Sequence, residues 1–123
     1  MVARVKVFSD GPSTAVIQAV GVSETGVTSI APSALKDSPP SLIIFRMQWI
    51  CSSGPLEIKW GNGESGDLLF FLHPNSTGNL DFTDFGGLDA RNVANSNGEI
   101  LLDASLLTPS NYTVILHVGK KLS

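Results

Sequence analysis

Three side chains in this chain belong to types that often act as nucleophiles or as nitrogen and sulfur metal ligands: Cys51, His73 and His117. A zinc site needs three or four Cys, His or carboxylate ligands brought together, and a reactive cysteine needs a histidine or a cation beside it. Cys51 ends a long apolar run, and the nearest histidine along the chain is His73. We therefore expect Cys51 to be a buried, unreactive thiol. We predict no catalytic residue, no cofactor site and no metal site.

Loop carboxylates offer the next candidate chemistry. Asp81, Asp84 and Asp89 lie close to the glycine pair Gly86–Gly87, and carboxylates with backbone carbonyls can hold calcium. Their spacing does not match an EF-hand loop, however, and aspartate is common at strand ends because its side chain caps turns. The stretch Gly61–Gly66 fits the pattern of a dinucleotide-binding loop, but a predicted strand follows it instead of a helix. We interpret the aspartates as turn residues and the glycine stretch as a hairpin turn.

The length and composition limit the classes of protein to which this chain can belong. The chain has 123 residues, the length of one domain. Charged residues make up 15% of it, against about 25% in a typical soluble protein. The net charge of −3 argues against a nucleic-acid partner. No apolar run reaches the ~18 residues of a membrane span, and residues Met1–Val7 lack the apolar region of a signal peptide. We expect synthesis in the cytoplasm and no membrane partner.

Short apolar runs separated by Gly, Pro and Asn clusters occur along the chain. The structural elements that these runs form must position any functional side chains. Alternation of apolar and polar residues within these runs is typical of strands, and their spacing is typical of a sandwich. We predict an all-β, single-domain antiparallel β-sandwich, jelly-roll-like, of about 7–8 strands. The domain covers residues 1–123, with residues 1–12 as a candidate N-terminal arm. The expected strands are Val5–Ser9, Ala15–Val22, Leu42–Cys51, Pro55–Trp60, Asp67–Leu72, Asn79–Phe82, Glu99–Ala104 and Asn111–Val118.

The side chains of two runs can be assigned to faces. In the run Pro55–Trp60, the apolar residues Leu56, Ile58 and Trp60 should point inward, and Glu57 and Lys59 outward. In the longest run, Leu42–Cys51, one face is wholly apolar and should lie in the core: Ile43, Phe45, Met47, Trp49 and Cys51. The other face carries two polar residues and should lie partly against polar groups or another subunit: Leu42, Ile44, Arg46, Gln48 and Ile50.

The C-terminal half carries a series of strand-and-turn motifs: Ile58–Gly61, Leu80–Leu88, Gly98–Leu102 and Tyr112–Lys121. This series resembles small virion structural proteins of tailed bacteriophages, a group that includes capsid decoration, or cement, proteins with a β-sandwich or jelly-roll fold. The resemblance covers Leu56 to Lys121. The matching motifs contain no catalytic residue, and the N-terminal half of the chain shows no such resemblance.

The resemblance implies a non-enzymatic protein on the capsid surface of a virion, which stabilises the head by bridging capsomers. Its partners would be the major capsid protein and further copies of itself, as a dimer or trimer. The residues 4–8 either add a strand to a neighbour or pair within their own sheet; both readings stay open. We expect the interface to include Arg4, Lys6 and Phe8 in this segment, Pro32, Leu35 and Pro39 in a proline-rich crossover, and Phe85, Leu88 and Arg91 in a long loop.

A second hypothesis is a carbohydrate- or receptor-binding β-sandwich module of a virion fibre or tail. Such modules stack a sugar ring on an exposed aromatic side chain, and Trp49 and Trp60 are the available indoles. Both lie on apolar faces of predicted strands, which favours a role in the core.

Overall fold

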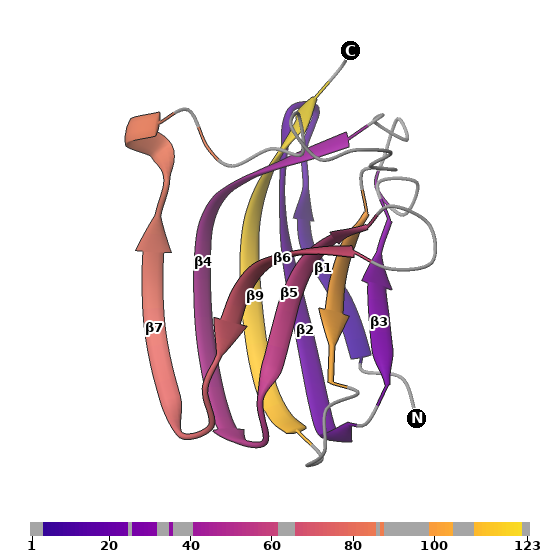
Figure 1. The fold of residues 1–123 in the computed structure, drawn as a ribbon. Coiled ribbons are helices and arrows are strands. Elements are labelled where there is room, and N and C mark those ends of the chain that lie inside the picture. Colours follow the sequence, from indigo (N-terminus) through magenta and orange to yellow (C-terminus); the bar gives the residue numbers. More distant parts are fainter. Residues whose placement is uncertain are drawn as a thin grey trace.

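The described part of the backbone forms nine strands and one short 3-10 helix. The computed structural model describes residues 4–24, 26–31, 35, 41–61, 66–85, 87, 99–104 and 110–121. In chain order (Figure 1) the elements are β1 (Arg4–Asp10), β2 (Thr14–Glu24), β3 (Val27–Ile30), β4 (Ser41–Ser53), β5 (Leu56–Gly61), β6 (Gly66–Leu72), β7 (Ser76–Asp81), η2 (Thr83–Phe85), β8 (Ile100–Asp103) and β9 (Ser110–Lys121).

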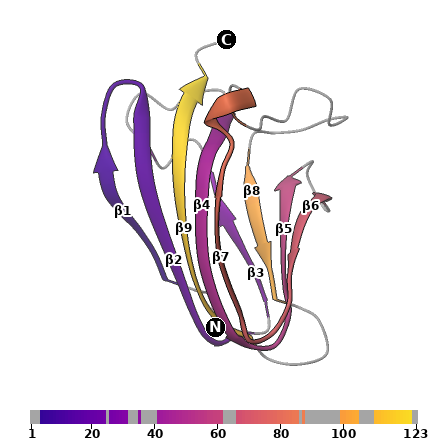
Figure 2. The same cartoon turned by 90° about the vertical axis from the view of Figure 1, so that its left-hand side faces the viewer.

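Two antiparallel sheets face each other (Figure 2). The five-stranded sheet has the order β1-β2-β9-β4-β7 and the four-stranded sheet has the order β3-β8-β5-β6. The chain runs out through β2 to β5 and returns through β6 to β9, so that β2 pairs with β9, β3 with β8, β4 with β7 and β5 with β6. This nested pairing is a jelly roll, which confirms the predicted fold class. β1 is an additional strand on the edge beside β2, and with it the described residues form nine strands.

Apolar side chains fill the space between the sheets. The alternation in β9 is regular, with Tyr112, Val114, Leu116 and Val118 all buried and the residues between them partly exposed. In β5 the predicted inward residues are likewise buried. Burying one such aliphatic side chain contributes about 1.5–3 kcal/mol. The side chains that are less than 2% exposed are Ile17, Leu42, Ile44, Met47, Leu56, Ile58, Ile100, Leu102, Leu116, Val114 and Val118.

The predicted core face of β4 is only half correct. The register between β4 and β9 shifts between Ile44 and Arg46, so that Phe45 is an extra residue in the ladder. A bulge of this kind moves the following side chains to the opposite face. Before it Leu42 and Ile44 are buried, and after it Met47 and Cys51 are buried. The bulge therefore places inside the two residues that we expected outside, and it leaves the outward positions of Arg46, Gln48 and Ile50 as predicted.

Three aromatic rings pack directly on glycines across the five-stranded sheet. Tyr112 lies over Gly21, Trp49 over Gly78 and Phe45 over Gly119; a Cβ atom at any of these glycines would overlap the ring. Gly21 and Tyr112 are cross-strand partners, as are Gly78 and Trp49. The missing side chain makes the space in which each ring lies, so these glycines are required by packing.

We expect Gly21→Ala to lower the free energy of unfolding by about 1–3 kcal/mol, because the Tyr112 ring is buried and the added methyl group overpacks the core. Urea unfolding followed by circular dichroism measures the change. Gly11→Ala is the matched control, since a Cβ there has only Thr14 O within reach, at 3.5 Å. Equal losses in the two variants would contradict the packing role of Gly21.

Candidate interaction surface

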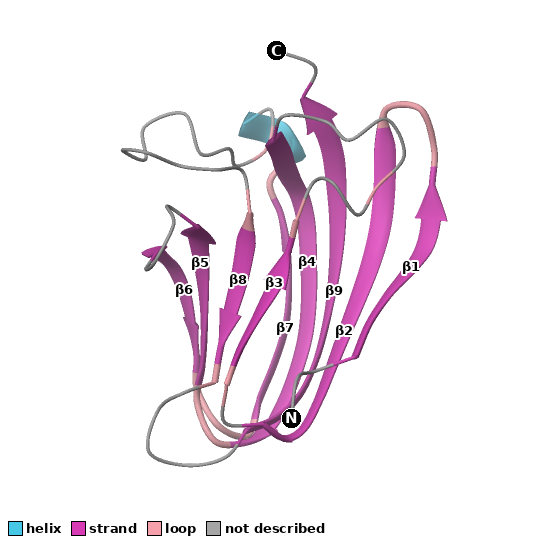
Figure 3. Cartoon of the chain, turned by 90° about the vertical axis from the view of Figure 1, so that its right-hand side faces the viewer, coloured by secondary structure: helices cyan, strands magenta, loops and turns pink. Residues whose placement is uncertain are grey.

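β1 forms one edge of the five-stranded sheet, and among the described strands it pairs with β2 alone. Val5 and Val7 are the partners of Ala19 and Ile17, which point inward. They are nevertheless 41% and 36% exposed, because β1 stands beyond the four-stranded sheet (Figure 3). Uncovered valines beside an open strand edge are a surface to which another strand can add.

The outward side of β1 carries basic charge. Arg4 and Lys6 are exposed, and the Lys6 ammonium lies 5.5 Å from the centre of the Phe8 ring, a cation–π contact of about 0.5–1 kcal/mol. Phe8 itself is 50% exposed. The three candidate residues predicted in this segment are thus gathered on one exposed strand. Within the chain, β1 pairs with its own β2, which is the second of the two readings left open by the sequence.

The other predicted interface residues fare differently. Leu35 was expected at the surface, and this expectation is wrong: Leu35 is 4% exposed and belongs to the hydrophobic core. Its apolar side chain packs in the hydrophobic core. The prolines near it in the sequence gave no reason to expect this burial. Phe85 ends η2, and its side chain lies outside the described structure. Pro32, Pro39, Leu88 and Arg91 also lie outside the described residues.

The outward face of the five-stranded sheet carries a hollow between β4, β7 and β9. Its volume is about 470 Å³, and we call it the outer hollow; its side chains come from Gln48, Ile50, Thr77, Asn79, Thr113 and Ile115, and the chain at Trp49 and Gly78 completes the lining. Sequence reasoning placed Gln48 and Ile50 on a partly polar face, but the contributions of β7 and β9 depend on strand pairing and could not be seen in either segment alone.

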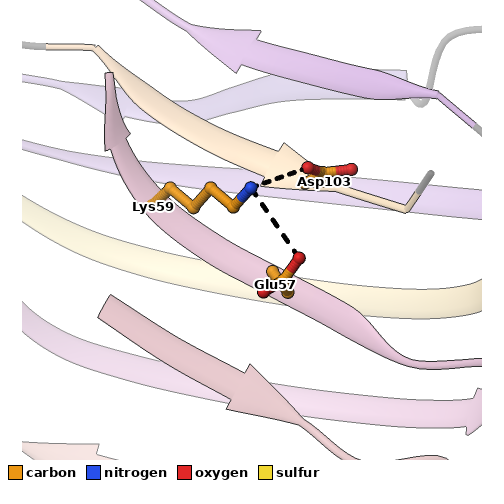
Figure 4. Close-up of polar contacts among 3 residues, drawn as sticks. All are labelled: Glu57, Lys59 and Asp103. Carbon is orange, nitrogen blue, oxygen red and sulfur yellow. Dashed lines mark hydrogen bonds and ion pairs between the residues drawn. The ribbon is translucent and has the colours of Figure 1, made fainter. Parts of the chain in front are cut away.

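On the outward side of the four-stranded sheet, Lys59 joins two carboxylates from neighbouring strands (Figure 4). Its ammonium donates a hydrogen bond to Asp103 Oδ2 at 2.9 Å and lies 3.7 Å from Glu57 Oε1. Glu57 and Asp103 are directly opposite each other in the β5–β8 ladder, where two like charges repel. The hydrogen bond to Asp103 raises the pKa of Lys59, aided by the charges of Asp103 and Glu57 and opposed by burial.

The raised pKa of Lys59 has a consequence for stability. A lysine that binds its proton more tightly in the folded state stabilises the fold below its unfolded pKa, and this contribution is lost as the pH rises through the folded value. We expect Lys59→Met to lower the free energy of unfolding by about 1 kcal/mol at pH 7, because the side chain is about one-fifth exposed and partly screened. The difference from the wild type should fade as the pH rises through and beyond the ordinary titration range of lysine.

Urea unfolding across pH 7–12, an interval that spans the ordinary titration of lysine, measures this difference. Arg4→Met, which removes an exposed cation, is the control. A Lys59→Met deficit that persists unchanged at the alkaline end would show that the ammonium charge does not contribute.

A second lysine is buried at the end of the sandwich where β9 ends. The Lys120 side chain is 1% exposed; it forms an ion pair with Asp10 and donates a hydrogen bond to Gly11 O at 2.6 Å. The backbone N–H of Lys120 also donates to Ser13 O at 2.8 Å. These contacts join the end of β9 to the turn between β1 and β2. Sequence analysis missed the pair because its members are at opposite ends of the chain.

The residues with potential chemistry are dispersed. Cys51 is buried, its Sγ donates to Gly54 O at 3.1 Å, and burial raises the pKa of the thiol. His73 is exposed and its ring is 4.8 Å from that of Phe71 in an edge-to-face contact. His117 lies on the outward face at the level of Arg46. Among the described residues, no group of three or more His, Cys, Asp or Glu side chains could hold a metal ion.

The aspartates of the loop after β7 act as turn residues where they are described. Asp81 accepts hydrogen bonds from Thr83 N at 2.9 Å and from Thr83 Oγ1 at 2.6 Å. The hydrogen bond from the Thr83 hydroxyl has the largest effect on the pKa of the Asp81 carboxyl, which it lowers. The bond from Thr83 N and the charge of Arg46 lower this pKa further. Asp84 is exposed in η2, and Asp89 lies outside the described residues. The Asp81 carboxylate therefore anchors the start of η2.

The two tryptophans are in unequal positions. Trp60 is 3% exposed in the core. Trp49 is partly buried; its ring packs on Gly78 and its Nε1 donates to Ser76 Oγ at 3.3 Å. A sugar could stack on Trp60 only after the core had opened.

The described residues include no helix with the length and apolarity that a membrane crossing requires.

No protein-family model matches the sequence, and the search of curated proteins found no match. Among solved structures, the chain is similar to an uncharacterized conserved protein with a double-stranded β-helix domain from Klebsiella pneumoniae, with 12% identity, a TM-score of 0.42, and 98% of this chain and 80% of the other covered. It is also similar to a cupin superfamily protein from Desulfitobacterium hafniense, with 6% identity, a TM-score of 0.36, and 97% and 77% covered.

Proposed function

We propose that this protein is a non-enzymatic structural protein of a phage virion: a capsid decoration protein that binds the major capsid protein and stabilises the head by bridging capsomers. The proposal starts from the resemblance of residues 56–121 to small virion proteins. The interior supports it, since the inward residues of β2, β4, β5, β8 and β9 are overwhelmingly apolar and closely packed. When apolar side chains fill the interior of a jelly roll, its surface is the part that can carry a function.

The open edge at β1 is the observation that carries the proposal. Val5 and Val7 are uncovered, and Arg4 and Lys6 bring positive charge beside them. A strand of a capsid subunit, or of a second copy in a dimer or trimer, would pair with the free backbone groups of β1 and cover these valines. The basic side chains favour an acidic segment in the partner.

Labelling of purified virions tests the assignment itself. An antibody against this protein should decorate the capsid shell in electron micrographs of virions of the phage that encodes it. Label confined to tails or fibres, or absent from the particles, would reject the capsid assignment.

Binding to isolated capsid shells tests the surface. The double variant Val5→Gln/Val7→Gln should bind shells about tenfold more weakly than the wild type, because it loses apolar contact at β1. Val27→Gln is the matched control, since Val27 is 49% exposed on β3, an edge strand of the other sheet. If the control loses as much affinity as the double variant, β1 is not the contact.

A further inference from the structure

β1 stands outside the set of strands that closes the sandwich. The strands β2 to β9 already complete the nested pairing of the jelly roll. Six of the seven residues of β1 are exposed, Asp10 is half-buried, and none of them belongs to the hydrophobic core. β1 is held by its ladder with β2 and by the contacts at its end, so it can leave β2 while the core stays closed.

The departure of β1 would uncover the edge of β2. The ladder between the two strands runs from Arg4 opposite Val20 to Asp10 opposite Ala15. Over this length the backbone groups of β2 need another strand to pair with. The segment that fits this edge at every position is the segment 4–10 itself, and a second copy of the chain supplies it with the same cross-strand pairs.

A buried contact at the end of β1 selects this segment over a foreign strand. The Lys120 ammonium forms an ion pair with Asp10, and the Lys120 side chain is 1% exposed. A strand without a carboxylate at this position would leave the buried ammonium without an opposite charge, which is costly. β1 of a second copy would bring its own Asp10 opposite Ala15 and so beside Lys120, where the ion pair would form again.

The turn between β1 and β2 is built from residues that suit an open form as well. Residues 11–13 join the two strands, and the Gly11 N–H donates to Thr14 O at 2.8 Å. The fixed φ of Pro12 is compatible with an extended chain, and a proline favours an extended conformation in the residue before it, here Gly11. With the turn straightened, β1 and β2 make one long strand, and two such strands can pair antiparallel about the turn.

We propose that β1 is an exchangeable arm: in a dimer, β1 of each copy pairs with β2 of the other copy, in the register that it has within the single chain. The exchanged dimer repeats the strand pairs and the ion pair of the monomer, so the protein concentration decides between the two forms. The two interpretations of residues 4–8 that the sequence left open then describe two states of one arm. The exchange does not rest on the capsid assignment, because it is measured on the purified chain.

Mixed disulfide formation gives the direct test. Lys6 and Gln18 are opposite each other and both reach the surface, so cysteines at these positions lie within disulfide distance when the strands pair. A Lys6→Cys chain and a Gln18→Cys chain are unfolded and refolded together under reducing conditions, and then oxidised. Refolding at about 0.5 mM should yield a covalent heterodimer, and a hundredfold dilution should lower that yield by at least about tenfold.

Three controls accompany this mixture. The wild type should form no covalent dimer, because Cys51 is buried once the chain has folded. Lys6→Cys mixed with Asn79→Cys should also form none, since Asn79 is exposed on β7 at the opposite edge of the sheet. If this pair links as readily as Lys6→Cys with Gln18→Cys, the links report random collisions. If Lys6→Cys alone gives as much dimer as the mixture, two β1 strands meet each other and no exchange takes place. A mixture that yields no heterodimer at the higher concentration overturns the proposal.

Locking the arm tests the same inference without a link between chains. The double variant Lys6→Cys/Gln18→Cys, oxidised as a monomer, ties β1 to its own β2. Refolded at about 0.5 mM, the reduced form should give a dimer peak in size-exclusion chromatography, and the oxidised form should lose at least about nine-tenths of that peak. Equal dimer peaks in the two forms would show that the copies associate without exchange of β1.

Discussion

Asp10→Ala should lower the free energy of unfolding by about 3–5 kcal/mol, because it takes the carboxylate away from a lysine that stays buried. The Lys120 side chain is 1% exposed and that of Asp10 is 16% exposed, so water screens the pair weakly. The Gly11 carbonyl still accepts a hydrogen bond from the ammonium, but a neutral carbonyl does not replace the charge of the Asp10 carboxylate. The end of β9 and the β1–β2 turn should loosen together.

Urea unfolding at pH 7 measures the loss for Asp10→Ala. Asp84→Ala is the control, since Asp84 is exposed in η2 and its removal should change stability by no more than about 0.5 kcal/mol. Adding Lys120→Met to Asp10→Ala should recover much of the stability, because an apolar side chain of similar length suits the buried position. A single-variant loss below about 1 kcal/mol would mean that the lysine reaches water when its partner is removed.

Trp60→Ala should be comparably damaging, with a loss of about 3–5 kcal/mol. The ring is 3% exposed and lies in the core on β5, opposite Ile100 of β8. Truncation to alanine would leave a large cavity in a close-packed interior, and the lining would lose its contacts. Trp49→Ala should cost less, about 1–3 kcal/mol, because Trp49 lies partly exposed over the edge strand β7.

Urea unfolding also ranks these tryptophan variants. Phe71→Ala is the aromatic control: Phe71 is 42% exposed on β6, and its loss should stay below about 1 kcal/mol. The comparison bears on the second hypothesis from the sequence. A Trp60→Ala protein that unfolds like the wild type would place the indole at the surface, where it could stack on a sugar.

Several features of the candidate surface could be predicted locally. The segment 4–8 alternates basic and apolar residues, which predicts an exposed strand with two different sides, and Arg4, Lys6 and Phe8 are exposed as expected. The same alternation in β5 correctly separated the buried Ile58 and Trp60 from the outward Lys59. Side chains two residues apart share a face of any strand, so this information is present before the strands pair.

Contacts between distant segments decided the rest. The register between β4 and β9 creates the bulge at Phe45 and so determines which residues of β4 are buried, and no single strand contains that register. Leu35 enters the core, and Asp10 meets Lys120, only because the nested pairing of the jelly roll brings segments from both halves of the chain together.

The amino-acid sequence by itself therefore determined that the chain is all β, where most strands lie and how the simplest of them face, because alternation and turn chemistry act over a few residues. The tertiary structure alone decided the buried ion pair, the glycine–aromatic contacts and the outer hollow. Each of these depends on which residues become neighbours across strands, and that follows from pairing over the whole length of the chain.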